Sequence, residues 1–63
     1  MTLITAANLG QPDDVYAALL AAHRGLTADQ QAALNARLIL ILMNHIGDPQ
    51  VLGAALELAK ETP

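Results

Sequence analysis

Apolar residues dominate the middle of this chain, where six consecutive positions, 38–43, carry no polar side chain. The stretch around them has the signals of a helix at both ends. Thr27 followed three positions later by Gln30 is a capping box, and Gly47 suits the left-handed conformation that ends many helices. The pattern therefore predicts a helix over 28–46.

This central helix is apolar over more of its circumference than an ordinary surface helix. At about 100° per residue, Gln30, Arg37 and Asn44 form one narrow polar stripe, because they lie seven positions apart. Apolar residues cover most of the remaining surface. A helix that is apolar almost all round has to be buried almost all round, so two short neighbouring helices are too little cover.

Two shorter helices are predicted, over 12–24 and 49–61. Pro12 suits the first position of a helix, where its missing N–H costs nothing, and Gly25 suits a left-handed cap at the other end. Asp48 is positioned as the N-cap of the third helix, and the proline after it suits the first helical position. Both boundaries of the central helix are therefore marked by a turn.

The predicted fold class is all-α: a small three-helix domain over 12–61, with a long central helix flanked by two shorter helices and preceded by an N-terminal arm over 1–11. The arm has no periodic pattern, and Asn8 and Gly10 interrupt it. We expect the flanking helices to pack on one side of the central helix and to leave its other side for a partner. The apolar residues expected at that interface are Leu38, Ile39, Leu42, Met43 and Ile46.

Composition excludes several classes of function. Lys and Arg total three and the net charge is −3, so no basic patch is available for nucleic acid. The chain has no cysteine for a disulfide or a zinc site. No apolar run approaches the roughly 20 residues that span a bilayer. The N-terminus lacks the cationic start of a signal peptide, and we expect a cytoplasmic protein.

Three short motifs, AHRGL at 22–26, LNARL at 34–38 and NHIGD at 44–48, resemble those of a family of small bacterial proteins grouped as a domain of unknown function. The resemblance extends from about Asn8 to Leu58. It implies a small all-helical protein with no assigned activity. It also implies genes close to those of flavin-dependent aromatic hydroxylases and other catabolic enzymes, and hence an accessory role beside such an enzyme.

Candidate chemistry is sparse. His23, His45 and Asp48 are the residues that could bind a metal, but two or three ligands are fewer than most sites have. His45 oriented by Asp48 could serve as an acid or base, since histidine titrates near neutral pH. The chain has neither Cys nor Ser as a nucleophile, and Thr27 is used as a cap. We therefore predict no enzyme, no catalytic residue and no cofactor.

Asn35 lies on an otherwise apolar side of the central helix, where an amide without hydrogen-bond partners is costly. One reading is that it bonds to the loop backbone near Gly25 or Gly47. The other is that it fixes the register of a helix–helix interface, as a buried Asn does in coiled coils.

Arg37, Asn44 and His45 are the remaining polar groups of this helix that could give an interface specificity. Arg37 could pair with a carboxylate of a partner or within the chain. Its expected partners within the chain are Asp13, Asp14 and Asp48.

The function predicted from these observations is that of a non-catalytic interaction module, either a homodimer or an accessory, stabilising subunit of a larger cytoplasmic enzyme. Two alternatives remain. A short helix, a glycine turn and a longer helix resemble a helix-turn-helix DNA-binding regulator, although the acidic charge opposes it. A small metal- or ligand-binding protein would use His23, His45 and Asp48.

Overall fold

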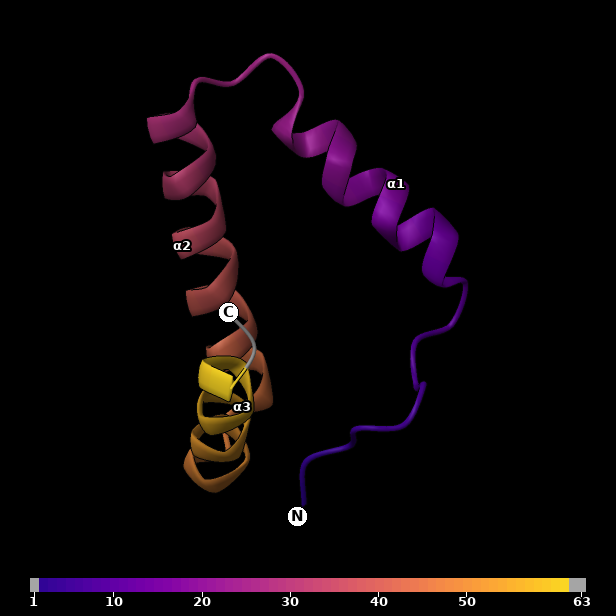
Figure 1. Ribbon diagram of the computed structural model, residues 1–63, viewed down its shortest axis with the longest axis vertical. Helices are drawn as coiled ribbons and strands as arrows, with labels where there is room; N and C mark the ends of the chain where they lie inside the picture. The colour runs from indigo at the N-terminus through magenta and orange to yellow at the C-terminus, as the bar shows by residue number, and fades with distance from the viewer. Residues whose placement is uncertain (1, 62–63) are drawn as a thin grey trace.

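The structure, a computed structural model, describes residues 2–61 and contains three helices: α1 (Pro12–His23), α2 (Ala28–Ile46) and α3 (Pro49–Glu61) (Figure 1). These residues include no strand. The all-α, three-helix fold class is thus confirmed, and the predicted bounds of α2 and α3 agree with the observed ones. Met1, assigned to the arm, lies outside the described residues, as do positions 62 and 63.

Helix α1 ends one residue earlier than predicted. Arg24 has extended backbone angles (φ −65°, ψ 131°), so the helix ends at His23. Gly25 then takes the expected left-handed conformation, with φ 78°. At the other end, Gln11 is left-handed without being glycine (φ 52°), and its carbonyl accepts hydrogen bonds from the N–H groups of Asp14 and Val15.

The caps of α2 are those that the sequence predicts. The N–H of Gln30 donates to Oγ1 of Thr27 at 3.2 Å, and the N–H of Thr27 donates to Oε1 of Gln30 at 3.0 Å. Both halves of the capping box are therefore formed. Gly47 ends the helix with φ 71°, and its N–H donates to the carbonyl of Met43.

The predicted N-cap of α3 is also present. Oδ1 of Asp48 accepts hydrogen bonds from the N–H of Gln50 at 2.9 Å and from that of Val51 at 3.4 Å. On the outer surface of α3, Lys60 and Glu57 form an ion pair at 3.0 Å. This pair is highly exposed and contributes little to stability.

The three helices do not close around a core. None of residues 2–61 is buried, and no two helices pack along their lengths. The accessible surface is 5450 Å², whereas a compact monomer of this mass would expose roughly 3,900 Å². The radius of gyration is 13.4 Å, compared with about 10.6 Å for a compact chain of this length.

Helix α1 leaves the turn at an angle and diverges from α2, and α3 begins directly after Gly47 and Asp48 without packing along α2 (Figure 1). The prediction that α1 and α3 pack together on one side of α2 was therefore wrong. Local caps fix where each helix ends, but the angle between helices depends on side-chain packing along their lengths, which no two helices of residues 2–61 have.

The N-terminal segment 2–11 has no regular secondary structure and runs beyond the start of α1 (Figure 1). Within it, Leu3 is partly covered, whereas Ile4 and Leu9 are 63% and 59% exposed. Within residues 2–61, no helix combines the length and the apolar character needed to cross a membrane.

Candidate functional site

An open groove lies between α1 and α2, and we call it the α1–α2 groove. Its volume is about 520 Å³. Each helix contributes a stripe of four residues with the spacing i, i+3, i+4, i+7, which places the four on one helix face. The lining residues are Val15, Ala18, Leu19, Ala22, Leu34, Arg37, Leu38 and Ile41.

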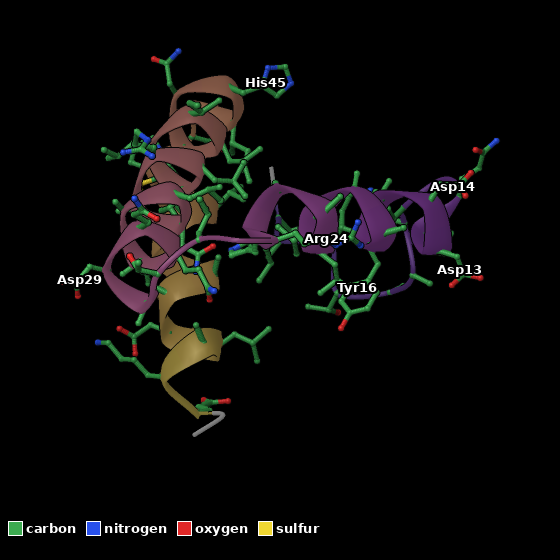
Figure 2. The ribbon with its side chains drawn as sticks, turned by 90° about the horizontal axis from the view of Figure 1, so that it is seen from above. Asp13, Asp14, Tyr16, Arg24, Asp29 and His45 are labelled. Carbon is green, nitrogen blue, oxygen red and sulfur yellow. The ribbon has the colours of Figure 1, made fainter. Side chains whose placement is uncertain are left out.

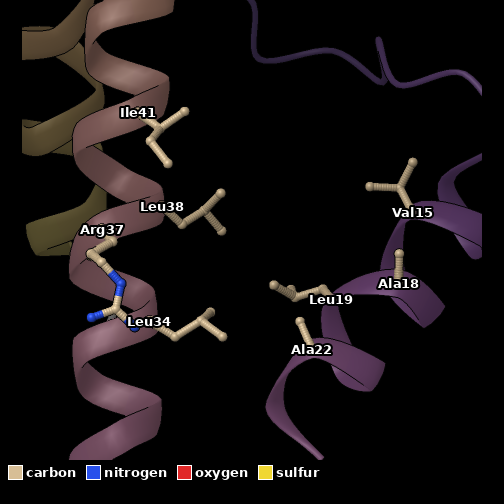
Figure 3. A pocket seen from close by; sticks show the side chains of 8 residues that line it. All are labelled: Val15, Ala18, Leu19, Ala22, Leu34, Arg37, Leu38 and Ile41. Atoms are coloured by element: carbon tan, nitrogen blue, oxygen red, sulfur yellow. The ribbon is translucent and has the colours of Figure 1, made fainter.

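The two stripes face each other across the groove without interdigitating. Leu19 and Ala22 point toward α2, and Leu34 and Leu38 point toward α1 (Figure 3). Leu34 and Leu38 are partly covered, whereas Ile41, nearer the open end, is 64% exposed. The groove is thus closed at the turn and open at the other end, and its walls are almost entirely apolar.

His23 connects α1 to α2 at the closed end of the groove. Its Nδ1 lies 2.7 Å from the carbonyl oxygen of Leu19, and its Nε2 lies 2.7 Å from Oδ1 of Asn35 on α2. A further hydrogen bond forms at the same turn, where Nε2 of Gln31 donates to the carbonyl of Leu26 at 3.1 Å. The bond from His23 connects α1 to α2, and the bond from Gln31 connects α2 to the turn, where Leu26 is partly covered.

The two acceptors around His23 favour its doubly protonated ring. A carbonyl oxygen and an amide oxygen both accept, so both ring nitrogens have to donate, as only the imidazolium can. The hydrogen bond to Leu19, and after it the bond to Asn35, raise the pKa of His23 above its ordinary value of 6.5. In the neutral ring, Nδ1 could still donate to Leu19, but the Asn35 amide would have to turn and present its NH₂ group to Nε2.

Substitution of Asn35 should change the pKa of His23 in a predictable direction. Asn35→Asp places a carboxylate against Nε2 and should raise the pKa further, whereas Asn35→Ala removes an acceptor and should lower it. The measurement is an NMR titration of the His23 ring nitrogens in both variants and in the unaltered protein. Equal His23 pKa values in the Asp and Ala variants would contradict the bridge.

The same bridge predicts how stability depends on pH. Because folding raises the pKa of His23, the contribution of the protonated ring is fully present below about pH 6.5 and is lost as the pH rises through the folded pKa. The melting temperature should therefore fall between pH 5.5 and pH 8. The fall should be smaller in a His23→Gln variant, and an unchanged fall would assign it to other groups.

The structure thus corrects the expectation for Asn35. Its oxygen bonds to the side chain of His23, and not to the loop backbone near Gly25 or Gly47. The sequence contained both partners, but nothing in the local pattern of either helix indicated that the turn would bring them together. A role of Asn35 in the register of an interface stays a prediction.

The other predicted polar residues are not paired within the described chain. Arg37 lines the α1–α2 groove and, in residues 2–61, forms no ion pair with the three expected aspartates. Asp13 and Asp14 lie at the outer end of α1, and His45 lies at the last turn of α2 (Figure 2). His45 and Asn44 are exposed.

The apolar residues predicted at an interface lie on more than one face of α2. Leu38 lines the groove. Ile39, Leu42 and Ile46 are outside its lining and are between 44% and 52% exposed. Met43 is partly covered. Whether these five residues contact a partner stays a prediction.

The described residues bring no three His, Cys, Asp or Glu side chains together as a metal site. His23 has both ring nitrogens in hydrogen bonds, and Asp48 caps α3. The hypothesis that His23, His45 and Asp48 form one binding site gains no support from this geometry.

The half of the groove that α1 contributes also has a signal in the sequence, which the prediction of an interface on the central helix did not include. From Val15 to Ala22 the chain has eight consecutive apolar residues, a longer run than the six at 38–43. Four of the eight are alanines, and alanine is common in helices whether they are exposed or buried. The run length, taken together with the missing polar face, was the signal for a second helix that needs cover.

A family described as "Protein of unknown function (DUF2783)" matches residues 3–61. The chain belongs to DUF2783. The resemblance inferred from the motifs in 22–26, 34–38 and 44–48 is thereby confirmed. The DUF2783 match includes all three helices and the whole groove. No curated protein and no solved structure matches the chain significantly.

Proposed function

We propose that this chain is a non-catalytic protein-interaction module, which acts as a homodimer or as an accessory, stabilising subunit of a larger cytoplasmic enzyme. The observation that carries the proposal is the absence of any buried residue in 2–61. A folded protein normally hides its large apolar side chains, and contiguous exposed patches mark interaction surfaces.

The size of the exposed surface supports this proposal. Relative to an unfolded chain of 6.6 kDa, the folded chain hides roughly 43% of the surface, whereas about 60% is usual for a domain of this length. Ile41, which lines the α1–α2 groove in the middle of α2, is 64% exposed. Helix α2 has strong caps at both ends, so its backbone is well defined while its side chains lack cover. A second protein surface would supply that cover.

The groove is also a poor candidate for catalysis. Its lining contains one charged residue, Arg37, and no carboxylate, histidine or hydroxyl group that could transfer a proton. Its open, apolar walls are suited to a helix with side chains of similar character.

Sedimentation velocity at 1–100 µM, combined with binding of an apolar fluorescent dye, tests this proposal. Assembly of the purified chain above 6.6 kDa supports a module that associates with itself. A helical monomer that binds the dye strongly supports an accessory subunit whose partner is another protein. A helical monomer that binds no dye would contradict both forms, because its apolar surface would then be covered by the chain itself.

A further inference from the structure

Helix α1 has apolar side chains around its whole circumference and little to cover them. Its groove face carries Val15 and Leu19, which are 46% and 38% exposed. On the other side, Tyr16 and Leu20 are 61% and 49% exposed. A helix that is apolar on every side is normally enclosed by other helices on every side. In one copy of the chain, α1 faces only the open groove.

The α1–α2 groove has the character that such a helix requires. Its walls present leucine, isoleucine and valine, and Ala18 and Ala22 lie on the α1 side. Small residues allow two helix backbones to approach closely, and Ala18 and Ala22 give the groove face of α1 such small side chains. The groove is open at the end away from the turn that joins α1 to α2 (Figure 3).

The exposed area matches a permanent dimer. Each chain exposes about 1,550 Å² more than a compact protein of its mass. Two chains that covered this excess would bury about 3,000 Å² together, within the roughly 2,000–5,000 Å² of obligate homodimers. A partner present only at times would leave the chain uncovered, whereas a second copy is available whenever the chain is made.

The charges of the chain do not oppose the binding of an apolar helix in the groove. The net charge is −3, but none of the Asp or Glu residues lines the groove. Arg37 is the only charged residue there, and its guanidinium lies along α2 instead of crossing the groove (Figure 3). Its aliphatic stem can cover an apolar neighbour while the charged group reaches water.

We propose that two copies of this chain interlock, with α1 of each copy seated in the α1–α2 groove of the other. The helices are then layered in the order α2, second copy's α1, α1, second copy's α2. The two α1 helices meet through their groove faces near Ala18, and the Tyr16 and Leu20 side of each α1 packs on Leu34, Leu38 and Ile41 of the other copy. This interface rests on the proposed function and is one specific form of it, with the two-fold symmetry usual in homodimers.

Single cysteines test the interface directly, because the chain has none of its own. Ala18 lies near the middle of α1, so two antiparallel α1 helices bring both copies of it close to the two-fold axis. Ala18→Cys should form a covalent dimer with a short bis-maleimide at micromolar concentration. Ala36→Cys is the matched control, since Ala36 is exposed on α2 outside the groove. We expect at least tenfold faster cross-linking for Ala18→Cys, and circular dichroism confirms that both variants are helical.

Amide hydrogen exchange of the unaltered protein gives a second measurement that needs no substitution. The interlocked dimer should protect the α1 amides from Val15 to Ala22 as strongly as those in the middle of α2. A dimer in which Ala36→Cys cross-links faster, or in which α1 exchanges freely, would overturn this interface but leave the proposed function intact. A helical monomer without dye-accessible apolar surface would overturn both.

Discussion

Replacing Leu38 with glutamate is expected to convert the proposed dimer into monomers at micromolar concentration. Leu38 is partly covered at the wall of the α1–α2 groove, where the second copy's α1 would lie against it. A carboxylate there would lose its water without gaining a cation or a hydrogen-bond donor, which costs several kcal/mol. We expect the dissociation constant to rise about a hundredfold or more, which corresponds to about 2.7 kcal/mol.

Leu40→Glu is the matched control for this substitution. It introduces the same charge into the same helix two residues away, but Leu40 is 65% exposed and outside the groove lining. Its dissociation constant should stay within about threefold of the unaltered protein, since surface substitutions usually change free energies by no more than about 0.5 kcal/mol. Sedimentation equilibrium measures both variants. A larger loss of affinity in Leu40→Glu than in Leu38→Glu would place the interface on the other side of α2.

Replacing Gly47 with alanine should lower the melting temperature at constant protein concentration. Gly47 has φ 71°, a left-handed conformation that an L-residue with a Cβ adopts at a cost of roughly 1–2 kcal/mol. The added Cβ would lie 3.7 Å from the carbonyl oxygen of Asn44, so the loss comes from the backbone conformation and not from a clash. For a domain of about this size, each kcal/mol lowers the melting temperature by about 4–8 °C.

Gly53→Ala provides a control of opposite sign. Gly53 lies inside α3, and a Cβ built there meets no atom within 4 Å. Glycine in a helix interior costs roughly 0.5–1 kcal/mol relative to alanine, so this variant should melt at a higher temperature. Thermal unfolding followed by circular dichroism measures both. A loss of stability in Gly53→Ala with none in Gly47→Ala would contradict the assigned roles of the two glycines.

The sequence predicted the helices well because each boundary is determined by residues close to it. The Thr27–Gln30 capping box and the Asp48 cap use hydrogen bonds that span two or three positions. Gly47 stops α2 through its own backbone conformation. Such signals are complete within a few residues, so the sequence alone is sufficient to read them.

The relation between the helices could not be predicted in the same way. The bond from His23 to Asn35 joins residues twelve positions apart, and it forms only because the turn takes one direction. The expected packing of α1 and α3 on one side of α2 assumed that the chain would cover itself as far as it could. The structure instead leaves α1 diverging, with apolar side chains on both of its faces. A single sequence contains no signal that separates these two outcomes. A helix face needs the same apolar residues whether it is buried by its own chain or by another chain.

This arrangement also gives His23 a specific place in the proposed assembly. It connects the two helices that form the groove, and it lies at the end where the groove closes. A fixed angle between α1 and α2 would keep the groove open for a second helix. Protonation of His23 strengthens this connection, so association should be at least as strong at pH 5.5 as at pH 8.

The central claim is that the apolar side chains of this protein are covered by another copy of the chain, so that folding and association are one process. Thermal unfolding measured over a hundredfold range of protein concentration tests it most directly. For a dimer whose chains unfold as they separate, this range adds about 2.7 kcal/mol. The melting temperature should therefore rise by about 10 °C or more for a chain of this size. Cooperative unfolding of a 6.6 kDa monomer, at a temperature independent of concentration, would contradict the claim.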